Sequence, residues 1–194
     1  LRGLPEEKPD ASSGLFSIDG GLLFERATSL GGQSMSQTLE PRVFYLYSGY
    51  DEQRDQPVFD AAELTFSYNQ LFRDTRFSGH DRLDDANQVS VGVTTRFFAD
   101  SDGRERLNAS IGQIFYFRDR EVRLNALGPI IDESLSATAV EFNWFPTNSW
   151  SIRSSMLYDT EDNEFDALSA QIGYRPNGGQ IFNLGYTLRE PPPS

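Results

Sequence analysis

Residues 87–98 read NQVSVGVTTRFF, and this stretch decides the fold. Its valines occupy alternate positions, Val89, Val91 and Val93, whereas the positions between them are small or polar. A period of two places successive side chains on opposite faces of a β-strand. The stretch therefore predicts a strand with one apolar face and one face of small polar residues.

The same alternation recurs along the chain, and no stretch has a convincing helical period. The alternating stretches are 14–26, 34–47, 87–98, 107–117, 138–144, 150–158, 168–174 and 182–188. Several of them are longer than the strands of an ordinary globular sheet. The chain therefore predicts an all-β fold of about eight antiparallel strands, in line with strand-length rules.

The connections between these stretches alternate in character. The turn-like ones are 27–32, 99–103, 146–149 and 175–179, and the intervening ones are 48–86, 118–133 and 159–164. Two of the three intervening connections are long. An antiparallel meander puts alternate connections at opposite ends, so tight turns gather at one end and long loops at the other. That asymmetry predicts an up-and-down transmembrane β-barrel of the outer-membrane type.

A soluble up-and-down barrel has the same alternation with its faces exchanged. Two features disfavour it. The polar positions are mostly Ser, Thr, Gly, Asn and Gln, as in a water-filled interior, instead of the Lys and Glu of a solvated surface. Aromatic residues such as Tyr45, Trp144 and Trp150 lie toward the strand ends, where interfacial girdles form.

Composition narrows the functional classes. The chain has 194 residues, 29 acidic against 17 basic side chains, a net charge of −12 and no cysteine. This balance argues against nucleic acid, which requires a basic face. The longest apolar stretch, 43–47, is far shorter than the roughly 20 residues of a membrane helix. No catalytic, nucleotide, cofactor or metal constellation stands out, so we do not expect an enzyme.

The expected organisation is a lead-in over 1–13, a strand region over 14–189 with a long loop at 48–86, and the start of a further loop at 190–194. The first residues are polar and show no signal peptide. The last residues are rich in proline, which cannot donate to a strand ladder. We therefore expect a run of consecutive strands from a larger outer-membrane barrel.

The long loop carries interleaved opposite charges. The candidate network consists of Arg73, Asp74, Arg76, Asp81, Arg82 and Asp85, with Asp84 beside them. The arginines could hold phosphates in a two-pronged geometry, or they could pair with the aspartates and pin the loop to the barrel interior. Interleaved charges usually satisfy each other, so the second, structural interpretation is favoured.

A second candidate lies on the polar face of the stretch 34–47. Glu40 and Arg42 flank Pro41 and share that face, which predicts a charged pair on the interior wall. Because proline lacks an N–H, we also expect a bulge or a local opening of the ladder at Pro41.

Two further features have plain interpretations. His80 is the one histidine, and with Ser78 nearby it could suggest a hydrolase, but no nucleophile motif frames the serine. The acidic run at 159–166 could bind a divalent cation, yet it lacks the glycine and spacing of a calcium loop. We interpret the first as a loop histidine and the second as a solvated acidic loop.

Residues 37–42, QTLEPR, followed by FYLY at 44–47, resemble a stretch of the LptD family of outer-membrane lipopolysaccharide (LPS) assembly proteins. Further matching segments are 57–60, 69–74, 76–79, 85–88, 91–96 and 110–117. The specific motifs cover residues 15–118, and beyond them only the strand rhythm matches. Residues 48–53 depart from the usual family pattern.

The resemblance implies a large outer-membrane barrel that is plugged by a lipoprotein, LptE, and supplied by a periplasmic bridge containing LptA. It implies LPS as the transported substrate, with the bridge contacted through an N-terminal domain outside this segment. The alternative is an independent eight-stranded outer-membrane barrel, either an adhesin or a lipid-modifying enzyme.

Overall fold

The computed structural model describes residues 13–53, 59–79, 82–124, 132–176 and 178–189. Nine strands form one antiparallel sheet: β1 (Leu15–Gly21), β2 (Phe24–Leu30), β3 (Gln33–Ser48), β6 (Ala86–Ala99), β7 (Glu105–Tyr116), β8 (Thr138–Trp144), β9 (Trp150–Asp159), β10 (Glu164–Tyr174) and β11 (Phe182–Arg189). Two short strands, β4 (Ala62–Glu63) and β5 (Phe77–Ser78), and one 3-10 turn, η1 (Tyr68–Phe72), lie between β3 and β6. Each of the eight predicted stretches contains a strand, which confirms the all-β antiparallel fold.

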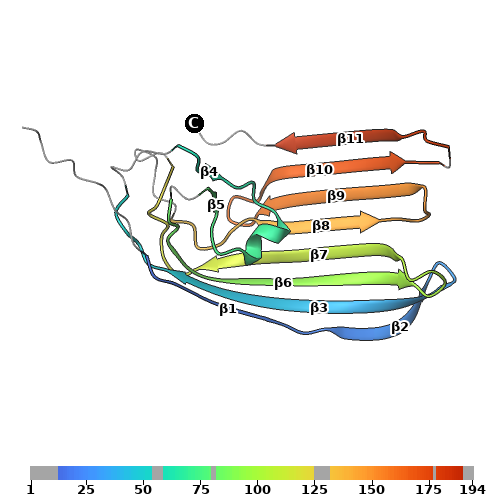
Figure 1. Cartoon of the computed structure of the whole chain (residues 1–194), viewed down its shortest axis with the longest axis horizontal. Coiled ribbons are helices and arrows are strands. Elements are labelled where there is room, and N and C mark those ends of the chain that lie inside the picture. The colour runs from blue at the N-terminus through green and yellow to red at the C-terminus, as the bar shows by residue number, and fades with distance from the viewer. Residues whose placement is uncertain (1–12, 54–58, 80–81, 125–131, 177, 190–194) are drawn as a thin grey trace, which may run out of the picture.

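The strand order follows the chain. From β3 the sheet continues through β6, β7, β8, β9, β10 and β11, and β1 and β2 both pair with β3. Figure 1 shows the tight connections at the right-hand end of the strands and the long ones at the left-hand end. This is the predicted up-and-down meander, with its two unlike ends.

The first predicted strand, 14–26, is divided in two by Pro41. The amide of Leu22 donates to the carbonyl oxygen of Pro41 at 3.0 Å, but Pro41 has no N–H to return the bond. The pairing of Gly21 with Arg42 and of Phe24 with Leu39 keeps one register across the gap. Pro41 therefore opens the ladder locally without shifting the register.

The hairpin after β2 is tighter than the predicted connection at 27–32. Strand pairing continues to Leu30 opposite Gln33, so only Gly31 and Gly32 form the turn. Their φ angles are 59° and 78°, which is the backbone of a two-residue type I′ turn. Glycine adopts both angles without steric cost, and the flanking residues 27–30 remain in the strand.

The sheet has two unlike faces. We call the face with Val89, Val91 and Val93 the outer face, because most of its neighbours across the sheet are also apolar, among them Val43, Ile111 and Phe115, although Gln113 lies opposite Val91. One row passes from Ile111 through Val140, Met156 and Leu168 to Leu188. Large exposed hydrophobic residues of this face include Ile18, Val43, Ile111, Trp144, Ile172 and Leu184. A continuous exposed apolar surface of this kind requires an apolar surrounding.

The opposite face, with Gln88, Ser90 and Thr94, is the inner face, and the buried core lies against it. These three side chains are buried although they are polar. The loop between β3 and β6 covers them, and its η1 turn packs on the inner side of β6, β7 and β8. Within the described residues, no helix is long and apolar enough to cross a membrane.

Candidate functional site

The η1 turn sits in a shallow bed formed by glycines of the inner face. A Cβ at Gly112 would lie 2.6 Å from Cδ1 of Leu71, and one at Gly92 would lie 2.9 Å from the Tyr68 hydroxyl. Leu71 is fully buried as a result. Thr94 also donates from its hydroxyl to the Tyr68 hydroxyl at 3.1 Å. The absence of side chains at two strand positions therefore creates the space that the loop fills.

Asp85 joins the two long connections at one end of the sheet. Its Oδ2 accepts from the amide of Glu121 at 2.8 Å, and its Oδ1 accepts from the amide of Val122 at 3.0 Å. Two arginines flank it, with Arg76 Nη2 at 3.4 Å and Arg118 Nη2 at 3.5 Å. Its side chain is fully covered. Asp85 is thus a buried carboxylate that accepts from both backbone and guanidinium donors.

Asp84 holds the same arginine from the other side. The amide of Arg76 donates to Asp84 Oδ2 at 2.8 Å, and Nε of Arg76 lies 3.2 Å from Asp84 Oδ1. Arg76 also donates to the carbonyl oxygen of Val122 and packs over the Phe77 ring. Burial raises the pKa of the Asp84 carboxyl above its ordinary value, against the opposing effect of Arg76. Its ionised form is therefore disfavoured by desolvation.

Arg82 belongs to a separate set of contacts with the start of the loop. Its Nη1 donates to the carbonyl oxygen of Gln53 at 2.7 Å, and the side chain is buried. The Gln53 side chain in turn bonds both the amide and the carbonyl of Leu83, at 2.9 and 2.8 Å. Arg82 and Gln53 therefore close the two ends of the described loop on each other.

The other predicted network residues stand apart. Arg73 and Asp74 are exposed, and neither forms an ion pair among the described residues. Asp81 and His80 lie outside the described residues. The structure thus brings Arg76 and Asp85 together, places Arg82 on a neighbouring contact, and leaves Arg73 and Asp74 at the surface. The role of this network stays a prediction.

Glu40 and Arg42 share the inner face, but the structure does not pair them with each other. Glu40 lies 3.2 Å from Nε of Arg96 on β6, and Arg42 donates from Nε to Asp19 on β1 at 2.9 Å. Both partners are diagonal neighbours across the ladder, since Arg96 lies opposite Thr38 and Asp19 lies opposite Phe44, and long charged side chains reach each other at that separation. The expected pair is therefore replaced by two cross-strand pairs. Arg42 also lies over the Phe72 ring, at 4.3 Å from its centroid.

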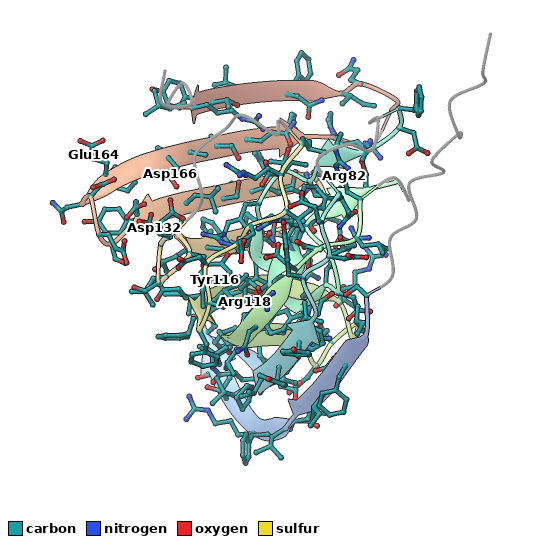
Figure 2. The ribbon with its side chains drawn as sticks, turned by 90° about the vertical axis from the view of Figure 1, so that its left-hand side faces the viewer. Arg82, Tyr116, Arg118, Asp132, Glu164 and Asp166 are labelled. Carbon is teal, nitrogen blue, oxygen red and sulfur yellow. The ribbon has the colours of Figure 1, made fainter. Side chains whose placement is uncertain are left out.

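In the acidic run at 159–166, one carboxylate accepts hydrogen bonds from backbone amides of the same run. Oδ1 of Asp159 accepts from the amides of Glu161 and Asp162, at 2.7 and 3.1 Å. Figure 2, which looks from the end with the long connections, shows Glu164 and Asp166 at the left, away from Arg118. In the described ranges, no three acidic or histidine side chains gather closely enough to hold a metal ion.

The comparisons with known proteins give the family of this chain. The family model described as "LptD: LPS transport system D" matches residues 6–194. The chain belongs to the LptD family. The match continues through β8–β11, beyond residue 118, where the sequence motifs end and only the strand rhythm is similar. The motif-based limit of the resemblance was therefore too narrow.

Relatives from two genera carry the same segment. The chain is 45% identical over 185 residues to an LPS-assembly protein LptD of Pseudomonas putida, which covers 90% of the chain and 19% of that protein. It is 41% identical over 191 residues to LptD of Xanthomonas oryzae, which covers 95% of the chain and 24% of that protein. LptD of Xanthomonas campestris is 42% identical over the same length. The chain thus spans about a fifth to a quarter of the LptD proteins that it matches.

Sequence reasoning missed several members of the interface between the long loops and the sheet. Arg118 was not grouped with the charges of the first loop, because it lies in the second one. The inner-face residues Phe44, Leu46 and Ile114 are also buried beneath the loop. A signal for them exists, since they are apolar residues at positions of otherwise polar parity. Such exceptions mark where a covering segment packs.

Proposed function

We propose that this segment forms part of the wall of an outer-membrane translocon that assembles LPS into the outer leaflet. The observation that carries the proposal is the two-faced sheet in a chain of the LptD family. Its outer face presents large apolar residues, and its inner face presents small polar and charged ones. A wall of this kind separates lipid on one side from a hydrated passage on the other.

The proposed mechanism involves no covalent chemistry. The hydrophilic sugar part of LPS passes along the inner face, while the strands hold that face away from the acyl chains of the bilayer. The paired charges of Asp19 with Arg42 and of Glu40 with Arg96 keep the wall polar without a large net field. The loop between β3 and β6, which includes η1, covers part of the inner face toward the end opposite the tight turns.

The proposed partners follow from the family. We infer that the full protein is a multi-pass barrel of the Gram-negative outer membrane, that an LptE-like lipoprotein occupies its interior, and that an LptA-like bridge delivers LPS through an N-terminal domain. The names of the relatives, LPS-assembly protein LptD, support LPS as the substrate. An independent eight-stranded barrel is not favoured, because in the curated relatives this segment is 19% or 24% of the protein.

The test uses two adjacent residues that face opposite sides of β10. Gln171 is on the inner face and Ile172 is on the outer face, and both lie in the half of the strand nearer the tight turns. Short turns are periplasmic in barrels of this class, so Ile172 should meet inner-leaflet phospholipid. A photo-crosslinking amino acid is placed at each position of the full-length protein in cells.

We expect an LPS adduct at Gln171 and none at Ile172, detected by immunoblotting for LPS after irradiation. The Gln171 adduct should disappear when LPS supply to the outer membrane is blocked. Equal LPS adducts at both positions, or none at Gln171 and at the second inner-face position Ser155, would contradict the proposed function.

A further inference from the structure

A hollow of about 490 Å³ opens where the strands meet the tight turns, at the far end from the loop network. Its lining comes from the start of β7, the connection after β8, the start of β9, the end of β10, the start of β11 and the connection between these last two strands. Four of the lining residues are arginines, Arg104, Arg106, Arg153 and Arg175, and one is a carboxylate, Glu105. In a chain with a net charge of −12, this is a strong local excess of positive charge.

The floor of this hollow, which we call the arginine pocket, is a row of small residues on the inner face. Ser151 pairs with Gly173, and Gly173 pairs with Asn183, on three neighbouring strands. A Cβ at Gly173 would lie 2.6 Å from Oγ of Ser151 and 3.2 Å from Oδ1 of Asn183. The glycine therefore brings two polar side chains together over an open floor.

The negative charges near the arginine pocket are already in use. Glu105 accepts from Nη1 of Arg96 at 2.9 Å and also from the Asn108 side chain. Asp102 accepts from Nη2 of Arg106 at 2.6 Å. Arg104 lies at 3.9 Å from the same carboxylate and is largely exposed.

Two arginines retain donors for a ligand. Arg153 donates from Nη1 to the Ser151 hydroxyl at 3.3 Å and lies over the Phe145 ring, at 5.5 Å from its centroid. Arg175 is exposed. Within the ranges that the structure describes, neither guanidinium pairs with a carboxylate. Each guanidinium offers a fork of N–H donors that matches the oxygens of a phosphate group.

We propose that the arginine pocket binds a phosphate group carried on the saccharide part of LPS. The inference rests on the proposed function and assigns that function a specific contact point. Arg153 and Arg175 supply the charged donors, while Ser151 and Asn183 supply neutral polar partners for sugar hydroxyls. The Phe145 ring adds an apolar surface beside them. A pocket in this position would engage the anionic headgroup at the periplasmic side of the wall.

The experiment measures saccharide binding to the full-length protein with its plug partner, purified in detergent. The ligands are the phosphorylated oligosaccharide released from LPS by removal of its acyl chains, the same oligosaccharide after chemical dephosphorylation, and inorganic phosphate. The variant is Arg153→Gln with Arg175→Gln. The matched control is Arg26→Gln, an arginine of β2 that bonds Gln37 and lies outside the arginine pocket.

We expect the double variant to raise the Kd of the phosphorylated oligosaccharide about tenfold or more, since hydrogen bonds to charged groups are the strong ones. The dephosphorylated ligand should bind the wild type as weakly as the phosphorylated ligand binds the variant. Arg26→Gln should leave the Kd unchanged. Arg153→Lys with Arg175→Lys keeps the charge and should give an intermediate Kd, which separates lost donors from lost folding.

An unchanged Kd in the double variant, or equal binding of both oligosaccharides, would overturn the proposal. Competition by inorganic phosphate at the same concentration as the oligosaccharide would assign the pocket to free phosphate and overturn the saccharide assignment. A photo-crosslink from Asn183 to the plug lipoprotein, with no oligosaccharide binding, would assign it to a protein partner. If Gln171 still forms its LPS adduct while these tests fail, only this inference falls and the proposed function stands.

Discussion

A single buried carboxylate connects two segments that are far apart in sequence. Asp85 lies at the end of the first long connection, and its oxygens accept from the amides of Glu121 and Val122 in the second one. Arg76 and Arg118 add charged donors from both segments. Removing one member of a buried charged set leaves the other members unpaired, which is costly. Asp85 is therefore the residue on which the arrangement of the two loops depends most.

Asp85→Asn should destabilise the second connection by about 2 kcal/mol or more. The two arginines lose their shared anion, and one of the two side-chain oxygens that accept from backbone amides becomes an NH2 group, which can only donate. The measurement is hydrogen exchange of the peptides around Glu121 and Val122 in the full-length protein. Asp74→Asn is the matched control, since Asp74 is exposed and forms no ion pair among the described residues. Equal acceleration in both variants would show that Asp85 has no special role.

Asp84 should respond to pH in the opposite sense to a paired surface carboxylate. Burial raises the pKa of the Asp84 carboxyl in the folded state, so its ionisation destabilises the folded state at pH values above that raised pKa. This destabilisation is lost as the pH falls toward the ordinary pKa of an aspartate. Asp84→Asn removes that cost. At pH 7 the variant should exchange amides near Arg76 more slowly than the wild type, and the difference should shrink as the pH falls toward 4. A difference that grows on acidification would contradict this assignment.

At the residue scale, the sequence predicted a charged network in the long loop but not which residues take part in it. Alternating Arg and Asp residues predicted a charged network in the first loop, and of its members Arg76 and Asp85 lie 3.4 Å apart in the structure. Arg73 and Asp74 have the same charges but follow η1 on its exposed side, and nothing local distinguishes them from Arg76. Arg118 could not be chosen because its position depends on the path of the second connection. Pairing across loops is decided by tertiary packing, which a local pattern does not encode.

At the element scale, the decisive fit is between the η1 turn and two glycines of the sheet. Leu71 and Tyr68 occupy space over Gly112 and Gly92 that any Cβ would enter. The buried cluster around Leu71 includes Ile114 and Ala139, so the turn anchors the long connection to β7 and β8. The turn and its bed therefore form one packing unit.

Gly112→Ala should release this packing unit. The new Cβ would lie 2.6 Å from Cδ1 of Leu71 and 2.7 Å from the carbonyl oxygen of Val91, and the backbone atom cannot move aside. We expect faster tryptic cleavage after Arg73 in the assembled full-length protein, at an enzyme concentration that spares the wild type. Gly20→Ala is the control, because a Cβ at Gly20 meets nothing within 4 Å. Unchanged cleavage in Gly112→Ala would mean that the turn is held by other contacts.

The strands were the most predictable elements, and the reason is their period. Residues 34–47 and 87–98 alternate over most of their length, and β3 and β6 extend them by only one residue at each end. The first stretch was less predictable, because its interruption comes from Pro41 on the partner strand and not from its own residues. The alternation of a strand can be read from its own residues. A missing N–H donor, in contrast, interrupts the strand that pairs with it.

At the scale of the whole molecule, the two faces make opposite demands on a substituted residue. Val91 lies on the outer face between Val43 and Gln113, and Gln171 lies on the inner face of β10. In the full-length barrel, Val91→Arg should cost about 2–4 kcal/mol if the site lies near the bilayer midplane. Gln171→Arg should cost about 0.5 kcal/mol or less, as surface substitutions do. Unfolding in denaturant with lipid vesicles measures both, and equal costs would reverse the assignment of the faces.

The described sheet is open, and this sets the last expectation. β1 and β11 each pair on one side only, and every residue of β1 and β11 is exposed. The free side of each carries a row of backbone donors and acceptors, which cost several kcal/mol each in hydrocarbon and template aggregation in water. Closing the edges on each other would force the strands into a narrow barrel whose interior must be filled by side chains. The inner face already holds η1 and its loop there, above residues as small as Gly112 and Ala139.

We therefore expect residues 1–194, expressed alone and refolded in detergent, to give no heat-resistant monomer. The measurement is the mobility shift between heated and unheated samples on a denaturing gel, together with the dispersion of amide resonances. The full-length protein refolded with the proposed LptE-like lipoprotein serves as the positive control, because the proposed larger barrel would pair each free edge with a further strand. A compact, protease-resistant monomer of the isolated segment would show that its edges satisfy each other, and it would favour the independent small barrel over a wall segment.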